Sequence, residues 1–237
     1  MGNCSCGEST GRYNYDNGEY YIGELRYGTP NGKGKLYYKN GDIKYDGDFV
    51  KGKRHGLGKY YFPDYFWFVM EDKKKFYFMK GDYYFGQFEN DNMHGKGIIY
   101  LIDGRVKYDG DLVNNQFEGN GKYYFESGGY YVGQLKQDMQ HGYGKMYDKD
   151  GSLRFEGNFV NDHMHGMGKM YFEDGQYYVA QFTNGEINGV GKLYSSNGTL
   201  LKEDYYVNGK KVKTVPKGII FDNYRHILDY LFNQWKI

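Results

Sequence analysis

The chain has 237 residues and a formal net charge of +1, from 31 basic and 30 acidic side chains. Aromatic residues make up 20% of it, glycine occurs 37 times, and Ala180 is the only alanine. Helices favour Ala and Leu whereas strands favour Tyr and Phe, so this composition excludes a mainly helical protein. The even spread of aromatic residues excludes a disordered one. A balanced charge gives no field to attract nucleic acid, so we expect no such partner, and it leaves self-association open.

The first ten residues are predicted to form a disordered tail that carries a candidate lipid anchor. Gly2 suits N-myristoylation, and Cys4 and Cys6 lie where palmitoylation often follows. Position 6 is Cys instead of the usual Ser or Thr, and no polybasic stretch follows. One acyl chain holds a protein to a membrane only marginally, so two signals are needed. Both a plain tail and an acylated tail therefore stay open as hypotheses.

The absence of other cysteines indicates a reducing compartment and excludes a structural disulfide framework. No run of 18 apolar residues is present, so no segment is predicted to span a bilayer. We expect a cytoplasmic protein, and an acylated tail would make it a peripheral membrane protein.

Residues 11–209 contain one pattern that occurs seven times. Its first copy is Tyr21-Ile-Gly-Glu-Leu25, followed by Gly28, by Gly32-Lys-Gly34 and by Asn40-Gly41. A degenerate eighth copy begins at Lys202, and residues 11–18 match the second half of a copy, so the array opens with a lone closing strand. The further copies begin after steps of 23 or 24 residues, and once after 39, at Tyr45, Tyr84, Tyr108, Tyr131, Phe155 and Tyr178.

Each copy is predicted to form a β-hairpin. In Tyr-x-Gly-x-Phe/Leu the three marked residues share one strand face, and the glycine leaves a slot in which a ring can cover bare backbone. The Gly-x-Gly pairs are predicted to form hairpin turns, and the Asn-Gly or Asp-Gly pairs to form the connecting ones. Two strands at ~4.8 Å spacing advance the array by roughly 10 Å per copy. A single sheet lacks a conventional core, so contacts between neighbouring copies are expected to stabilise it.

The motif Tyr-x-Gly-x-Phe-x-x-Gly-x-x-x-(His)-Gly-x-Gly, with its closing Asp/Asn-Gly, resembles the MORN (membrane occupation and recognition nexus) repeat. The resemblance implies an all-β, elongated, grooved, single-layer array of antiparallel hairpins, of the small repeat-only type similar to radial spoke head and other axonemal proteins. It implies a scaffold and not a reaction. One departure is that the family often has Trp where this chain has Leu25, Phe49, Phe88, Leu112, Leu135, Phe159 and Phe182.

The aromatic residues of the motif are the candidates for partner binding in the groove. Large buried aromatic side chains dominate the energetics of protein interfaces. The candidates are Tyr45, Phe49, Tyr84, Phe88, Tyr108, Tyr131, Phe155, Phe159 and Tyr178.

The 39-residue step contains an aromatic insertion, predicted at residues 60–74. One interpretation is a lengthened hairpin whose rings pack on the sheet. The other is a protrusion that anchors a partner, for which Phe66 and Trp67 are the candidates.

Residues 210–237 are predicted to form a linker and an amphipathic helix over about 223–235, because apolar side chains recur there at helical spacing. The helix either covers the open sheet edge or docks into a partner, with Trp235 as a candidate contact.

No catalytic residue, metal site or cofactor is predicted. Equivalent positions in neighbouring copies lie roughly 10 Å apart, too far for two imidazoles to share one zinc ion. We therefore expect the histidines that precede the Gly-x-Gly pairs to hydrogen-bond to turn backbone. These are His55, His94, His141 and His165.

Two functional hypotheses follow. The first is a non-catalytic scaffold that binds protein partners in a cytoskeletal or ciliary assembly. The second is an acylated tether that places the array at a membrane, with weak phospholipid contact through basic residues. Those residues are Lys51, Lys53, Arg54, Lys73, Lys74, Lys210, Lys211 and Lys213.

Overall fold

The computed structural model describes residues 7–63, 66–69 and 75–212. The candidate acylation sites Gly2, Cys4 and Cys6 lie outside the described residues, and so do the predicted helix at 223–235 and Trp235 within it. For Phe66 and Trp67 the structure describes the backbone alone.

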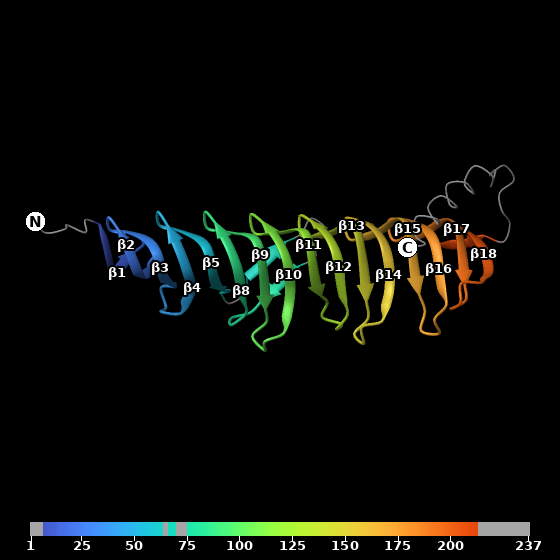
Figure 1. Ribbon diagram of the computed structural model, residues 1–237, viewed down its shortest axis with the longest axis horizontal. Helices are drawn as coiled ribbons and strands as arrows, with labels where there is room; N and C mark the ends of the chain where they lie inside the picture. The colour runs from blue at the N-terminus through green and yellow to red at the C-terminus, as the bar shows by residue number, and fades with distance from the viewer. Residues whose placement is uncertain (1–6, 64–65, 70–74, 213–237) are drawn as a thin grey trace, which may run out of the picture.

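The prediction of an all-β array is confirmed. Seventeen strands form one open antiparallel sheet, in which each strand pairs with the next along the chain, and the molecule is elongated (Figure 1). The sheet contains β1 (Glu8–Asn14), β2 (Tyr20–Arg26), β3 (Thr29–Tyr37), β4 (Ile43–Val50), β5 (Lys53–Tyr61), β8 (Tyr83–Glu89), β9 (Asn92–Tyr100), β10 (Val106–Val113), β11 (Gln116–Tyr124), β12 (Tyr130–Lys136), β13 (Met139–Tyr147), β14 (Leu153–Val160), β15 (His163–Tyr171), β16 (Tyr177–Thr183), β17 (Glu186–Tyr194), β18 (Leu200–Val207) and β19 (Lys210–Val212). A second, two-stranded sheet contains β6 (Phe66–Val69) and β7 (Lys75–Phe78).

Two kinds of turn alternate along the sheet. A two-residue turn joins the strands of one hairpin, as between β12 and β13, where Gln137 and Asp138 have φ of 50° and 68°. Positive φ at both residues defines the type I′ turn, whose twist matches that of the strands. A five-residue loop joins successive hairpins, as at Asp148–Ser152, where the Ser152 amide donates to Oδ1 of Asp150 (3.0 Å).

The Gly-x-Gly pairs are not turns, contrary to the prediction. They lie within strands, and the first glycine of each pair forms a bulge. In β13, Gly142 has a φ of 63°. Between the pairs Gly133↔Gly144 and Leu135↔Gln140, the three residues 141–143 of β13 lie opposite the single residue Gln134 of β12. Oε1 of Gln134 accepts a hydrogen bond from the amide of Tyr143 within this bulge (3.2 Å). Bulges bend a strand, so each hairpin is bent at this level.

The predicted packing of rings over glycine is confirmed. The second glycine of each pair faces the glycine, or in one case the alanine, of the Tyr-x-Gly motif across the ladder, as in Gly133↔Gly144. A Cβ atom at Gly144 would lie 2.3 Å from Cε2 of Tyr131, because the tyrosine ring covers that bare backbone. The Tyr131 hydroxyl donates to the carbonyl of Gln134 (2.7 Å).

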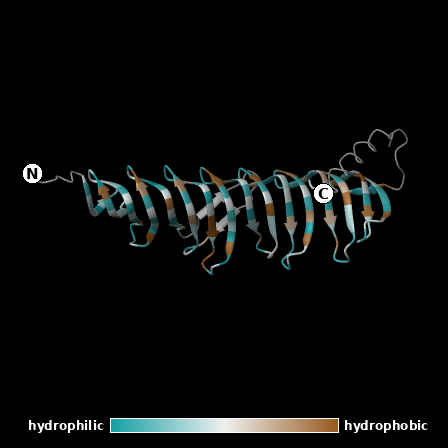
Figure 2. Cartoon of the chain, in the orientation of Figure 1, coloured by the Kyte–Doolittle hydropathy of each residue, from teal (hydrophilic) through white to brown (hydrophobic). Residues whose placement is uncertain are grey.

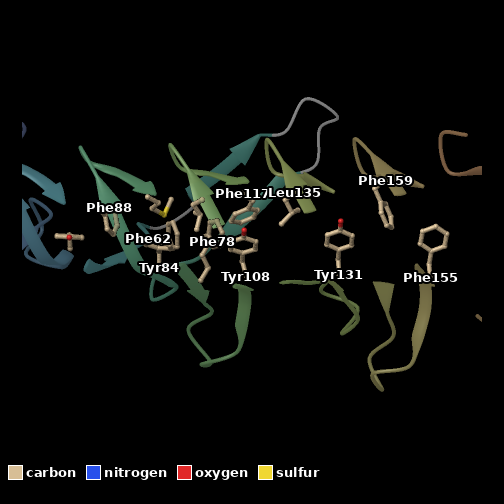
Figure 3. Packing of buried hydrophobic residues seen from close by; sticks show 14 of the residues in the cluster. Phe62, Phe78, Tyr84, Phe88, Tyr108, Phe117, Tyr131, Leu135, Phe155 and Phe159 are labelled. Atoms are coloured by element: carbon tan, nitrogen blue, oxygen red, sulfur yellow. The ribbon is translucent and has the colours of Figure 1, made fainter. Parts of the chain in front are cut away.

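A continuous cluster of buried side chains runs along one face of the sheet, which corrects the expectation that the array lacks a core. Rings of one hairpin contact those of the next, as in the edge-to-face pair Tyr131–Phe159 (5.3 Å between centroids, 88°). Each hairpin therefore completes the core of its neighbour. Figure 3 shows the side chains converging from the two arms of the bent sheet, Tyr84, Tyr108, Tyr131 and Phe155 from one arm and Phe88, Phe117, Leu135 and Phe159 from the other.

The insertion replaces one five-residue loop. Tyr60 and Tyr61 belong to β5 and pair with β8, so the insertion does not begin at residue 60 as predicted, and the whole connection between the two strands spans residues 62–82. The Phe62 amide donates to the Asp82 carbonyl (3.0 Å), as the Tyr38 amide does to the Asp42 carbonyl in an ordinary loop (2.9 Å). The loop is thus opened at its tip and the hairpin β6–β7 is inserted there.

The base of the insertion is part of the core. Phe62 and Phe78 are each 1% exposed and stack at 4.3 Å with their planes 10° apart. The buried carboxylate of Asp82 accepts hydrogen bonds from the amides of Met79 (2.9 Å) and Ile102 (2.7 Å). These contacts tie both ends of the insertion to the sheet.

Candidate functional site

The aromatic residues predicted to bind partners lie in the core. None of the nine is more than 8% exposed, because each ring lies on backbone or on a ring of the next hairpin. The predicted groove surface is therefore the filled interior of the bent sheet, and contact with a partner through these side chains requires the array to open. The residues that were predicted to line an accessible groove and are instead buried are Tyr45, Phe49, Tyr84, Phe88, Tyr108, Tyr131, Phe155, Phe159 and Tyr178.

A second row of tyrosines lies on the opposite face of the sheet, and we call it the outer tyrosine row. We call the ring that begins each Tyr-x-Gly motif the inner ring. Some members of the outer tyrosine row directly precede an inner ring in the same strand, and the others pair with those members from a neighbouring strand. Because successive side chains of a strand point to opposite faces, all of them face outward. All members are half-buried. Polar and apolar residues alternate along the strands in Figure 2. The row contains Tyr20, Tyr37, Tyr61, Tyr83, Tyr100, Tyr124, Tyr130, Tyr147, Tyr171, Tyr177 and Tyr194.

The outer tyrosine row is divided into groups by cationic residues. Lys44, Lys107 and Arg154 occupy the equivalent positions on β4, β10 and β14. One tyrosine triplet follows each of these cationic positions, and the three triplets have nearly identical ring geometry. In the triplet Tyr124–Tyr130–Tyr147 the first two centroids are 5.7 Å apart at 44°, and the last two are stacked at 4.6 Å and 15°. The triplet Tyr61–Tyr83–Tyr100 has 6.0 Å at 45° and 4.9 Å at 21°, and Tyr171–Tyr177–Tyr194 has 6.2 Å at 44° and 5.1 Å at 14°.

One lysine lies over each triplet. Nζ of Lys122 is 4.7 Å from the ring centroid of Tyr124 and 4.0 Å from that of Tyr130. Lys59 lies 3.6 Å from Tyr83, and Lys169 lies 3.9 Å from Tyr177. These are cation–π distances, in which the ring face attracts the ammonium group. Arg12 covers Tyr20 in the same way at 3.8 Å, beside the stacked pair Tyr20–Tyr37.

The groups recur every four strands. The covered tyrosines lie on β2, β8, β12 and β16, so the sheet repeats its outer surface every two hairpins, or roughly 19 Å at the usual strand spacing. The array thus presents three equivalent triplets and one related pair, Tyr20–Tyr37, each with aromatic faces, hydroxyls and a cation, along one face of the sheet. The chemistry that these groups offer is aromatic stacking, hydrogen bonding and positive charge.

Carboxylates separate the groups and form cross-strand ion pairs. Asp46 lies 3.1 Å from Lys35, and Glu156 lies 3.1 Å from Lys145. Burial by itself raises the pKa of Glu156, but hydrogen bonds from Tyr171 and Lys145 outweigh it and hold that pKa below its usual value. Burial lowers the pKa of Lys169 and raises that of Tyr171. The carboxylate therefore stays charged and holds the tyrosine hydroxyl in place.

Sequence reasoning missed the outer tyrosine row, although a signal for it is present. The residue before each inner ring alternates between tyrosine and a basic residue along seven successive copies. These residues are Tyr20, Lys44, Tyr83, Lys107, Tyr130, Arg154 and Tyr177. The alternation indicates a period of two hairpins, and the triplets emerge once the cross-strand register is known.

The other predicted groups do not form a site. At two of the histidines predicted to hydrogen-bond to turn backbone, His94 and His141, the Nδ1 atom is buried without a hydrogen-bond partner. Within residues 7–63, 66–69 and 75–212, no group of three or more His, Cys, Asp or Glu side chains could hold a metal ion. Of the basic residues proposed for lipid contact, Lys51 lies in the turn after β4, Lys53 and Arg54 begin β5, and Lys210 and Lys211 lie in β19 at the far end of the sheet. The other three, Lys73, Lys74 and Lys213, lie outside the described residues.

These features define a repeat protein built from β-hairpins. The family model of the MORN repeat matches residues 21–43, 45–65, 84–104, 108–130, 131–153, 155–177 and 178–200, well over half of the chain. The chain belongs to the MORN repeat family. MORN repeats are generally non-catalytic scaffold modules that interact with proteins or membranes.

Comparison with curated proteins gives no match. Among solved structures, the wild-type TCP10 domain of CPAP from Danio rerio is 13% identical, with 83% of this chain and 89% of that chain covered and a TM-score of 0.24. A protein of unknown function from Bacteroides caccae is 11% identical, with 84% and 82% covered and a TM-score of 0.20. At these scores neither likeness informs the function of this chain.

In the part of the chain that the structure describes there is no helix long and apolar enough to cross a membrane.

Proposed function

We propose that this protein is a non-catalytic scaffold that binds protein partners along its outer face in a cytoskeletal or ciliary assembly of the radial-spoke or axonemal kind. The supporting observation is the outer tyrosine row, in which the same lysine-covered group recurs every four strands. Tyrosine is enriched in protein interfaces because it offers a large rigid ring and a hydroxyl. Equal spacing on a straight array suits a partner whose own binding sites repeat.

The burial of the inner rings supports the outer face over the interior as the binding surface. A partner in the interior would have to displace rings such as Tyr131, which is fully buried and hydrogen-bonded. A partner on the outer face contacts tyrosines that are already half-exposed. Binding on the outer face therefore does not disrupt the packing of the inner rings.

The test compares cell fractions of wild type with a variant of the central triplet, Tyr124→Thr/Tyr130→Thr/Tyr147→Thr. Threonine suits strands, so the variant is expected to keep the fold, as checked by circular dichroism. We expect wild type in the detergent-resistant cytoskeletal pellet and the variant in the soluble fraction. The control changes two exposed tyrosines that lie outside both the row and the ends of the sheet, Tyr27→Thr/Tyr143→Thr, and is expected to stay in the pellet. A folded triplet variant that remains in the pellet contradicts the proposal.

The second candidate function is an acylated membrane tether, which the amino-terminal Gly2, Cys4 and Cys6 support. The same fractionation tests it with Gly2→Ala, which removes the myristoylation site. Movement of Gly2→Ala from the membrane fraction to the cytosol supports the tether. An unchanged distribution contradicts it and leaves the scaffold to be judged by the triplet variant.

A further inference from the structure

The sheet begins with half of a strand. β1 pairs with β2 through Gly11↔Gly23 and Tyr13↔Tyr21, as the second half of β3 pairs with β4 through Gly34↔Gly47 and Leu36↔Tyr45. Residues 11–14 of β1 therefore correspond to the part of a hairpin's second strand that follows the bulge, whereas Ser9 and Thr10 occupy the positions that Gly56 and Leu57 hold in β5. Six of its seven residues are exposed, and no other described strand pairs with its outer edge.

The sheet ends with the complementary half. β19 contains three residues and pairs with the turn-proximal end of β18, through Tyr205↔Val212, Tyr206↔Lys211 and Val207↔Lys210. These pairs correspond to Phe49↔Arg54 and Val50↔Lys53 in β4 and β5, before the bulge. The remaining part of β18, Leu200–Asp204, pairs with β17 on one edge. On its other edge it has no partner strand within the described residues.

We propose that the array associates head to tail, with residues 11–14 of one copy pairing with Leu200–Asp204 of a second copy. β19 and residues 11–14 of the incoming β1 then supply the two halves of one second strand. β1 is antiparallel to β2, and β19 is antiparallel to β18, so β1 in line with β19 keeps the alternation of the whole sheet. The register is that of Gly47↔Gly58 and Asp46↔Lys59, which places Gly11 opposite Asp204 and Arg12 opposite Glu203.

The side chains at this junction are complementary. Arg12 opposite Glu203 reproduces the opposite charges of Lys59 and Asp46 across β4 and β5. Glu203 is partly exposed, and its ion pair with Lys192 is long, at 3.7 Å. Tyr13 of the incoming strand faces Lys202, a cation opposite an aromatic ring.

The physical reason for association is the unpaired backbone at both edges. An exposed edge strand offers a row of N–H and C=O groups that another strand can satisfy. The two edges belong to different ends of the molecule, so the contact is heterologous and generates an open filament instead of a closed dimer. Successive copies would continue the two-hairpin spacing of the outer tyrosine row across each junction, since Arg12 covers Tyr20 as Lys59 covers Tyr83.

The test uses the purified full chain and needs no other partner, so its outcome is independent of the scaffold proposal. Sedimentation and light scattering over a range of concentrations are expected to show oligomers whose mass keeps rising. Arg12→Glu places Glu opposite Glu, and Glu203→Arg places Arg opposite Arg, so each variant alone is expected to be a monomer. Circular dichroism and thermal melting establish that each variant is folded.

Mixing the two variants gives the decisive result. Glu at position 12 of the first variant then lies opposite Arg at position 203 of the second. The unaltered Arg12 of the second variant likewise lies opposite the unaltered Glu203 of the first. The equimolar mixture is therefore expected to form oligomers of alternating variants, although neither variant does so alone. A wild-type monomer at every concentration overturns the proposal, and the edge of β18 is then covered by another segment. Oligomers that persist in both single variants, or a mixture that stays monomeric, also overturn it.

Discussion

The two faces of the sheet repeat with different periods. On the inner face a ring lies over a pair of small residues in every hairpin, as Tyr131 does over Gly133 and Gly144. On the outer face the neighbouring position alternates, with Tyr130 on β12 and Arg154 on β14. An inner ring recurs in every hairpin, about every 24 residues, whereas a group of the outer tyrosine row recurs in every second hairpin.

This difference separates what the fold requires from what it allows. Each bare pair of small residues is covered by a ring, so the inner face has little freedom from one hairpin to the next. The outer face is in contact with solvent, and its packing would be satisfied by many residues. A strict two-hairpin period there is a property of the surface, which is why we propose the outer face as the binding surface.

The largest expected effect is the loss of an inner ring. Tyr131→Ala removes a fully buried side chain and its hydrogen bond, and is expected to cost about 3–5 kcal/mol of the free energy of unfolding. The adjacent outer residue is the matched control, because Tyr130→Ala loses cross-strand contacts worth less than about 1 kcal/mol. Urea denaturation of both variants measures the difference. Similar losses in the two would contradict the division between the faces.

A methyl-bearing side chain under an inner ring is expected to have the next largest effect. In Gly144→Val the new Cβ would lie 2.3 Å from Tyr131, so the ring must leave its place, at a cost of about 1–3 kcal/mol. Lys145→Val is the control on the outer face, where the loss is limited to a surface ion pair of about 0–1 kcal/mol. The melting temperatures of the two variants test the ranking, which fails if Gly144→Val melts with the wild type.

Alkaline pH should act on the inner row. Burial raises the pKa of Tyr21 to about 12 and also raises the pKa of Tyr84, Tyr108 and Tyr131 above the ordinary value. Because the folded state holds these phenols neutral, their stabilisation is complete below pH 10 and is lost as pH rises toward 12 and beyond. We expect tyrosinate absorbance from the inner row to appear together with unfolding seen by circular dichroism. Full tyrosine ionisation in a still-folded array would contradict this.

The smallest expected change in stability comes from substitutions in the two-residue turns at the hairpin tips. Oδ1 of Asp138 accepts a hydrogen bond from the Phe117 amide (2.7 Å), and the Asp138 amide donates to the Phe117 carbonyl (3.1 Å). The equivalent Gly185 makes only the second bond, to Met164 (2.9 Å). Asp138→Gly is expected to cost about 1 kcal/mol. Gly185→Asn is the reverse change and should raise the melting temperature, whereas a decrease would show that the side-chain bond contributes nothing.

The sequence by itself determined the hairpin array and its inner face. The Tyr-x-Gly-x-Phe alternation places Tyr131 and Leu135 on one face with the bare glycine between them, and strand geometry alone dictates that. It also indicated where the array is interrupted. It placed the Gly-x-Gly pairs wrongly in turns, because a positive φ at Gly142 serves a bulge as well as a turn, and the two differ only in how the strands pair.

Only the tertiary structure decided which aromatic residues are accessible and which meet across strands. Tyr45 begins one copy of the motif and Tyr130 directly precedes another; the first is fully buried, whereas the second lies in a half-exposed stack. Tyr124, Tyr130 and Tyr147 form one triplet because the five-residue loop, the type I′ turn and the bulge together set the register of three strands. Burial and cross-strand contact depend on that register and on the bend of the sheet, which no single segment of sequence contains.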